Sequence, residues 1–269
     1  RRVFGILDRE EETGGEGSCR DPKGFVELEH VDFSYSRETP LIEDLNLSVR
    51  PGQKVAIIGP TGCGKTTLMN LLMRFYEPDS GRILIDGQDI SEVTLSSLRS
   101  QMGIMLQESF IFSGTLLDNI RYGRLDASEE EVVKAAKVVR ADDFIREMPD
   151  GYKTTVNERG NRLSQGQKQL VSFARTLLSD PRILILDEAT SSIDTKTERL
   201  LQEGLNALLK GRTSFIIAHR LSTIKNCDRI LYISNKGIAE MGSHDELMEK
   251  KGLYYDMYTA QAREQGLDV

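Results

Sequence analysis

The sequence is poor in tryptophan, cysteine and histidine and has fewer basic than acidic residues. Its 269 residues contain no tryptophan, three cysteines and three histidines, and 35 basic residues stand against 42 acidic ones. The resulting net charge of −7 argues against binding to a nucleic-acid backbone, which needs a basic surface, so we expect no nucleic-acid partner. Cysteines 19, 63 and 227 are odd in number and lack metal-ligand spacing, which predicts a reducing compartment without a disulfide framework.

Long apolar runs and a leader are missing as well. No run approaches the roughly 18 apolar residues of a membrane-spanning helix, and no signal-peptide pattern opens the chain. Because the first residues are Arg1 and Arg2 instead of Met, we expect a piece of a longer protein. Residues 8–24 are acidic, Gly-rich and nearly free of apolar side chains, which predicts a linker that follows an upstream domain.

Short apolar runs dominate the rest of the chain. The runs "KVAIIG", "RILILDE", "SFIIAHR" and "RILYIS" are rich in Ile and Val, and helical segments separate several of them. This pattern is typical of parallel strands buried on both faces, so the fold class is α/β. The stretch "FVELEHVDFSY" alternates instead, which predicts a half-buried strand.

Residues 91–180 read as mostly helical, and one helix within them is well marked. Ser128 precedes Glu131 by three residues, which is the pattern of a capping box. Apolar side chains then recur with helical spacing at Val132, Ala135, Ala136 and Val139. We interpret about 91–180 as a helical subdomain inserted into the α/β core.

The stretch "GPTGCGKTT", residues 59–67, matches the phosphate-binding pattern G-x-x-x-x-G-K-[ST]. Glycines let backbone amides turn toward phosphate oxygens, Lys65 adds a full positive charge, and the Thr66 hydroxyl can ligate Mg²⁺. A chance Gly-rich turn is the alternative, but an apolar strand before and a helical pattern after favour a nucleotide loop. The expected nucleotide-binding residues are Gly59, Thr61, Gly62, Cys63, Gly64, Lys65, Thr66 and Thr67.

Polar residues end two of the predicted strands. Asp187 is placed to hold Mg²⁺ through water, and Glu188 to orient and deprotonate an attacking water. His219 is the first polar residue after the run "FIIA" and is placed to donate to a γ-phosphate. The alternatives are a solvated loop start for the two acids and an ordinary strand end for the histidine.

The stretch "LSQGQ", residues 163–167, fits two interpretations. As a helix start it is a capping box, in which Ser164 accepts from the amide of Gln167 and Gln167 reaches back. As a site it would present the exposed amides of a helix N-terminus to an anion.

The order of these pieces carries a resemblance. "GPTGCGKT", Gln107 in "IMLQES", "LSQGQ", "ILILDE", "SSID" at 191–194 and "AHR" resemble, in the same order, the nucleotide-binding domain of ABC transporters over about residues 24–262. The resemblance implies a P-loop core with a mixed sheet (a parallel core plus an antiparallel β subdomain) and an inserted helical subdomain. It also implies ATP and Mg²⁺, with 1–23 as linker and 263–269 as tail.

Residue roles are implied in the same way. Tyr35 is similar to the aromatic that stacks on adenine, Glu188 to the general base and His219 to the γ-phosphate sensor. Gln107 would touch Mg²⁺ and the attacking water, and Asp194 would lie on a loop that crosses to a second such domain. In that head-to-tail pair, Ser164, Gly166 and Gln167 would contact the nucleotide held by the partner.

The subtype implied is an exporter. "TTVNERG", with Glu158 and Arg159, and "MLQESFIFSGTLLDNIRYG" resemble segments that contact a transmembrane domain. We therefore expect ATP-driven dimerisation that powers export, at the cytoplasmic face of a membrane. A soluble ABC ATPase and a nucleotide-binding regulatory half with little turnover are the alternatives. Gln165 replaces a glycine of the usual LSGGQ, which indicates either tolerated variation or one half of a heterodimer with a weak site.

Overall fold

The computed structural model describes residues 14–19, 21–36, 39–106, 109–157, 162–188, 195–264 and 266. Its strands are β1 (Val26–Phe33), β2 (Ile42–Val49), β3 (Lys54–Ile58), β4 (Ser80–Ile85), β5 (Gln88–Asp89), β6 (Met102–Met105), β7 (Gly114–Thr115), β8 (Thr155–Val156), β9 (Ile183–Asp187), β10 (Thr213–Ile217), β11 (Arg229–Ser234) and β12 (Gly237–Gly242). Its α-helices are α2 (Lys65–Leu72), α3 (Leu95–Ser100), α4 (Leu116–Arg121), α5 (Glu129–Val138), α6 (Ala141–Glu147), α7 (Gln165–Leu178), α8 (Thr195–Leu209), α9 (Leu221–Lys225), α10 (His244–Lys250) and α11 (Leu253–Glu264). The described residues also form two 3₁₀ helices, η1 (Ile90–Glu92) and η2 (Gly151–Lys153).

A six-stranded sheet forms the centre of the molecule, in the order β12-β11-β3-β10-β9-β6. From β11 to β6 the neighbours are parallel, and β12 joins the edge antiparallel to β11. The four apolar runs singled out in the sequence are β3, β9, β10 and β11, so the prediction of parallel strands is confirmed. Two hydrophobic clusters cover the two faces of this sheet.

Alternation along β3 shows how the two faces are divided. Val55 and Ile57 belong to the cluster that includes α2, whereas Ala56 and Ile58 belong to the cluster that includes α7 and α8. Burial on both sides explains why this strand is a continuous apolar run rather than an alternating one.

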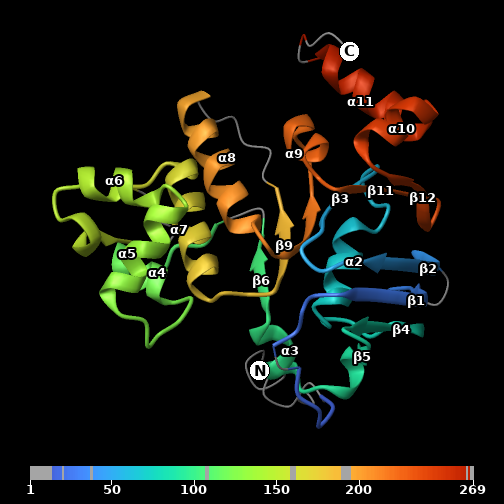
Figure 1. Cartoon of the computed structure of the whole chain (residues 1–269), viewed down its shortest axis with the longest axis horizontal. Coiled ribbons are helices and arrows are strands. Elements are labelled where there is room, and N and C mark those ends of the chain that lie inside the picture. The colour runs from blue at the N-terminus through green and yellow to red at the C-terminus, as the bar shows by residue number, and fades with distance from the viewer. Residues whose placement is uncertain are drawn as a thin grey trace, which may run out of the picture.

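A second sheet is antiparallel, in the order β2-β1-β4-β5. It lies on the face of the six-stranded sheet that α2 covers (Figure 1). Val26, Leu28, Val31 and Phe33 of β1 are buried, while the residues between them are partly exposed. The predicted half-buried strand is confirmed, and with it the mixed sheet composition of the fold.

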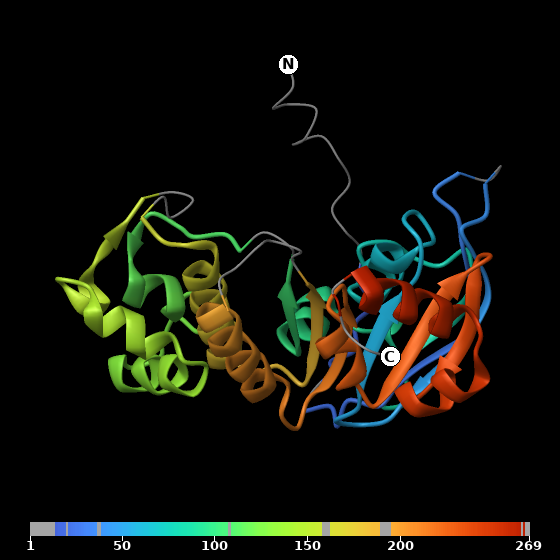
Figure 2. The same ribbon diagram turned by 90° about the horizontal axis from the view of Figure 1, so that it is seen from above.

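Helices α4 to α7 form a lobe beside the sheets, which is clearest in the view of Figure 2. The Ser128 capping box is present on α5, and Val132, Ala135, Ala136 and Val139 are all buried, as predicted. The start of the expected range 91–180 includes β6, which the structure places at the edge of the central sheet, paired with β9. The lobe itself begins after that strand. The sequence pattern does not separate β6 from its neighbours, because a four-residue strand between two helices has little local periodicity.

The stretch expected to be a linker is partly bound to the domain. The amides of Gly15 and Gly17 donate to the carbonyls of Val93 and Glu92, and the Thr94 amide donates to the Gly17 carbonyl. A Cβ on Gly15 would lie 2.0 Å from the Glu92 carbonyl, so this close approach requires glycine. We call residues 14–19 the N-terminal strap.

The chain ends in α10 and α11, which contact each other, and α11 also contacts α9 (Figure 1). None of the helices in the part of the chain that the structure describes is long and apolar enough to span a bilayer.

Candidate nucleotide-binding site

The register of the central sheet brings three strand ends to one level. Ile217 of β10 pairs with Ile57 of β3 on one side and with Asp187 of β9 on the other. The loop after each strand therefore starts at the same edge. These loops carry the predicted phosphate loop, Glu188 and His219, so residues distant in sequence meet at the carboxyl ends of parallel strands, where ligands of α/β proteins bind.

The predicted phosphate loop joins β3 to α2, as expected. Gly59, Gly62 and Gly64 have φ values of +142°, +80° and +104°, which favour glycine. A Cβ on Gly59 would also lie 2.2 Å from the Ile233 carbonyl oxygen. No side chain caps the N-terminus of α2, so its first amides face outward as an anion site requires.

Lys65 is the first residue of α2, and its ammonium lies over the loop. Its Nζ donates to the carbonyls of Gly59 and Pro60, both at 2.8 Å, and lies 3.9 Å from the Cys63 Sγ. Next to it, the Thr66 side chain is exposed and Thr67 is buried. This loop thus presents a positive charge, glycine amides and an accessible hydroxyl, a donor set that fits a polyphosphate with Mg²⁺.

Tyr35 lies beside the residues that follow this loop. Its hydroxyl is 3.1 Å from the Thr67 hydroxyl, and its ring makes T-shaped contacts with Phe33 and Tyr76 at 4.9 and 5.1 Å between centroids. The side chain is nevertheless 56% exposed, so an aromatic surface remains for stacking. Nothing in the sequence marks Tyr76, which follows the end of α2 by four residues.

Asp187 ends β9 and is half-buried. Burial raises the pKa of its carboxyl above the ordinary value, and the charges of His219 and Lys65 partly offset that effect. Asp187, Lys65 and His219 therefore share one electrostatic neighbourhood, as expected from the sequence. In the described ranges no group of three or more His, Cys, Asp or Glu side chains is arranged to hold a metal ion.

Glu188 is held by the loop that precedes α9. Its Oε2 accepts from the amides of His219 at 3.0 Å and Arg220 at 3.1 Å, and its Oε1 accepts from the Thr223 hydroxyl at 2.8 Å. The Arg220 guanidinium lies 3.7 Å from Oε1 and bridges to Glu198 at 3.3 Å. A carboxylate has about four acceptor positions, so these three hydrogen bonds leave one for a water molecule. Thr223 was missed because nothing in the sequence marks a hydroxyl inside a short helix.

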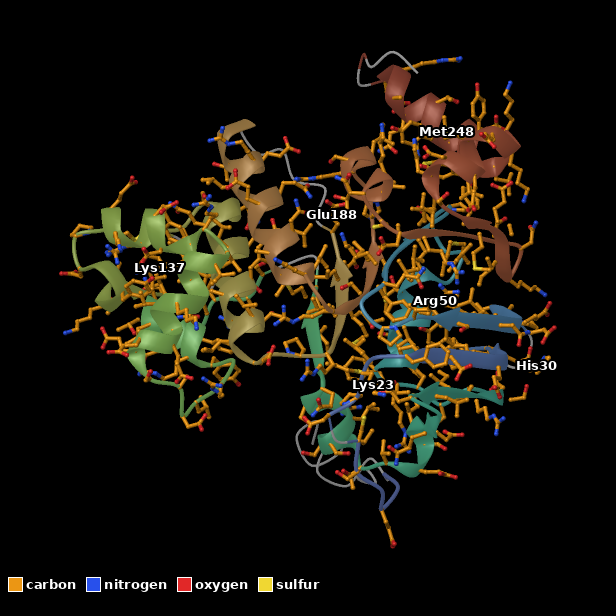
Figure 3. All side chains as sticks on the ribbon, in the orientation of Figure 1. Lys23, His30, Arg50, Lys137, Glu188 and Met248 are labelled. Carbon is orange, nitrogen blue, oxygen red and sulfur yellow. The ribbon has the colours of Figure 1, made fainter. Side chains whose placement is uncertain are left out.

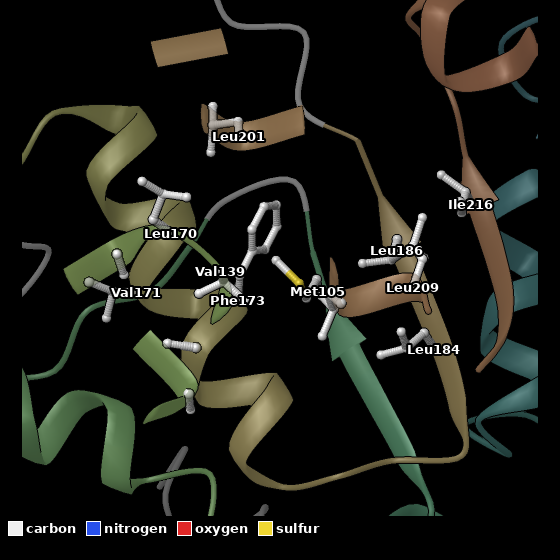
Figure 4. Packing of buried hydrophobic residues seen from close by; sticks show 14 of the residues in the cluster. Met105, Val139, Leu170, Val171, Phe173, Leu184, Leu186, Leu201, Leu209 and Ile216 are labelled. Atoms are coloured by element: carbon white, nitrogen blue, oxygen red, sulfur yellow. The ribbon is translucent and has the colours of Figure 1, made fainter. Parts of the chain in front are cut away.

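Glu188 lies between the helical lobe and the C-terminal helices (Figure 3). A mainly apolar pocket adjoins it, and Figure 4 shows the packing around this pocket between β6, β9, α7 and α8. Its lining includes Met105, Phe173, Leu186, Leu201 and Arg220. The Glu188 side chain is itself 9% exposed, so its carboxylate is largely screened from bulk solvent, which strengthens its electrostatic interactions.

The stretch "LSQGQ" is the start of α7, with the capping box predicted for it. The Gln167 amide donates to the Ser164 hydroxyl at 3.2 Å, and the Gln167 side chain accepts from the Ser164 amide at 2.9 Å. A Cβ on Gly166 would lie 2.3 Å from the Thr197 methyl of α8, so packing within the chain already requires this glycine. Ser164 and Gln165 are exposed.

The structure does not bring α7 to the phosphate loop of its own chain. The side chains of α7 and α2 belong to hydrophobic clusters on opposite faces of the central sheet. Ser164 and Gly166 are thus outside the cluster of predicted site residues. Gln107, Asp194, Glu158 and Arg159 lie outside the described residues.

The family model and the similar proteins found by comparison are all ABC transporters. Residues 42–191, over half of the chain, match the family described as ABC transporter. An uncharacterised ABC transporter ATP-binding protein of Bacillus subtilis, YfiC, is 52% identical over 97% of this chain and 44% of its own length. The fatty acid ABC transporter ATP-binding/permease protein of Mycobacterium bovis is 52% identical over 96% of this chain and 41% of its own length.

A solved structure, that of a bacterial Atm1-family ABC exporter with ATP bound, matches with a TM-score of 0.86 and 44% identity over 97% of this chain and 46% of that chain. The fold and the site define an ATP-binding domain of the P-loop ATPase class. The chain belongs to the ABC transporter family. It spans less than half the length of the relatives it matches.

Proposed function

We propose that the chain binds Mg²⁺–ATP and hydrolyses it to power export across a membrane. The observation that carries this proposal is the register of β3, β10 and β9. Ile57, Ile217 and Asp187 are paired, so the phosphate loop, His219 and Glu188 begin at one edge of the sheet. The phosphate-loop residues 59–67 would bind the phosphates, and Tyr35 would stack on adenine. Thr66, Asp187 and Gln107 would hold Mg²⁺, which neutralises charge on the β- and γ-phosphates when bound.

Glu188 would act as the general base. It would take a proton from the attacking water as the water oxygen bonds to the γ-phosphorus and the bond to the ADP oxygen breaks. His219 would donate to the γ-phosphate, and the one acceptor position left on Glu188 would serve the water.

The partner arrangement would be head to tail. Since α7 and α2 face opposite sides of the central sheet, Ser164, Gly166 and Gln167 would complete the nucleotide site of a second ATP-binding domain, with Asp194 crossing between them. The second domain would come from the same or a different chain. The altered signature at Gln165 would fit either tolerated variation or a heterodimer with one weak site, and transport by a homodimer of the full protein would contradict the heterodimer.

The domain layout proposed is a linker at 1–23, an ATPase domain at 24–262 and a tail at 263–269. A membrane domain would precede this chain, with Glu158 and Arg159 in contact with it, and the ATPase domain would lie on the cytoplasmic face. The length of the relatives and their description as ATP-binding/permease protein and exporter support this layout.

Replacing the proposed base tests the function. We expect Glu188→Gln to lower the ATPase rate by about 10²- to 10⁴-fold, the usual contribution of a general base. The variant should still bind Mg²⁺–ATP and should accumulate as a dimer, measured by light scattering after size exclusion. The control is Glu198→Gln, which removes the ion pair between Glu198 and Arg220 but leaves the Glu188 carboxylate unchanged. An unchanged ATPase rate in Glu188→Gln would rule out the assigned base.

A further inference from the structure

Helix α11 is fixed at its start by a buried carboxylate. Glu240 of β12 is 8% exposed, and its two oxygens accept from the amides of Leu253 and Tyr254, both at 3.0 Å. A carboxylate at a helix N-terminus satisfies free amides and complements the helix dipole. Tyr254 is fully buried, and its hydroxyl lies 2.7 Å from the His244 Nδ1. The start of α11 is therefore anchored to the edge of the central sheet.

Near its other end, α11 contacts the loop of the candidate site. The Gln261 Nε2 donates to the His219 carbonyl oxygen at 2.8 Å. The amide of the same residue, His219, donates to the Glu188 Oε2 at 3.0 Å. The backbone of His219 is thus held from two sides, by Glu188 through its amide and by α11 through its carbonyl.

We propose that Gln261 is a positioning residue for Glu188 and His219. Its hydrogen bond fixes the peptide group that follows His219, and so restricts the backbone rotation that would move the imidazole. It also keeps the neighbouring Arg220 amide, which belongs to that peptide group, directed at Glu188. This role rests on the proposed function, in which Glu188 and His219 act in hydrolysis.

The position of α11 does not depend on this one contact. Glu240 binds its first amides, and Tyr254, Thr259 and Ala262 are buried along its length. Gln261 itself is only half-buried. Removing its amide group should therefore leave α11 in place and change only how the His219 loop is held.

Gln261→Met in the 269-residue chain tests the proposal, because methionine keeps the length and the helix preference of glutamine but cannot donate. We expect kcat for ATP hydrolysis to fall about three- to tenfold, which corresponds to one hydrogen bond of ordinary strength. KM for ATP should stay within about twofold of the wild-type value, since the phosphate loop is untouched. The melting temperature should be unchanged. Arg263→Ala, at an exposed position of the same helix, is the matched control.

Three results would overturn the proposal: an unchanged kcat in Gln261→Met, a parallel change in kcat and KM, or an equal loss in Arg263→Ala. Glu188→Gln measured in parallel separates this from the proposed function. If Glu188→Gln abolishes hydrolysis while Gln261→Met is normal, only the role of Gln261 fails. If Glu188→Gln is itself normal, the proposed function fails.

Discussion

Asp187, a residue of the proposed nucleotide site, lowers the stability of the fold when its carboxyl is ionised. It lies at the end of a strand that is buried on both faces, and burial raises the pKa of its carboxyl above the usual value of about 3.9. The folded protein therefore holds this proton more tightly than the unfolded chain does. In the pH window between the two pKa values, the contribution of Asp187 to the free energy of unfolding falls as pH rises, and it stays low above that window.

Asp187→Asn should remove this dependence. At pH 7, without nucleotide, we expect the variant to melt at a higher temperature than the wild type, because no buried charge has to form. The difference should shrink as pH is lowered below about 3.9, where the wild-type carboxyl becomes protonated in both states. Thermal melts of both proteins at several pH values measure the difference in melting temperature. Asp126→Asn, at a side chain that is 89% exposed, is the control. A constant difference at every pH would contradict the ionisation argument.

At the scale of the element, α7 combines a helix start with a proposed binding surface. The Ser164 capping box stabilises the helix, and α5 has the same device at Ser128. Because any helix of this type needs its first amides satisfied, the box says nothing about function. Only the position of the helix start relative to a second chain would make it a site.

Substitutions at Ser164 separate the two roles. Ser164→Ala should lower the free energy of unfolding by about 1 kcal/mol, as loss of an N-cap does. Ser164→Asp keeps a capping acceptor, so stability should stay near wild type, but its charge would repel the partner's γ-phosphate and the ATPase rate should fall at least about tenfold. Ser128→Ala is the control: it should lose similar stability and keep its ATPase rate. Normal hydrolysis in Ser164→Asp would argue against the proposed dimer contact.

At the scale of the whole molecule, the N-terminal strap ties the start of the described chain to the segment before α3. Its backbone pairs with residues 92–94, and the Cys19 amide donates to the Ser97 hydroxyl at 3.1 Å. If a membrane domain precedes this chain, as proposed, movement of that domain would reach the ATPase domain next to α3.

Gly15→Val should release the strap, because a Cβ at this position would overlap the Glu92 carbonyl. Hydrogen exchange at the amides of Gly17 and Thr94 should speed up, since both bonds lie within the strap contact. The midpoint of global unfolding should change little, because Cys19 is the one strap residue that belongs to a hydrophobic cluster. Glu16→Val, at the exposed position next to it, should leave exchange unchanged. Equal protection in both variants would show that Gly15 is not needed for the contact.

Much of the fold could be predicted, and the reasons are local. Apolar runs identify β3, β9, β10 and β11 because burial on both faces leaves a mark in each strand separately. Capping boxes identify the starts of α5 and α7 because donor and acceptor are three residues apart. By contrast, β6 was absorbed into a helical stretch, since four residues between helices give too little pattern.

For the site, sequence by itself determined the parts whose chemistry is contiguous. The phosphate loop, Asp187 with Glu188, and His219 each lie at or just after the end of a strand, and parallel strands bring their ends to one edge. Tertiary structure decided what holds these parts in place. Thr223, Gln261 and Tyr76 contact the site from elements whose own sequences are ordinary. The physical reason is that a hydrogen bond across 31 to 42 residues depends on how helices pack, and no short pattern records it.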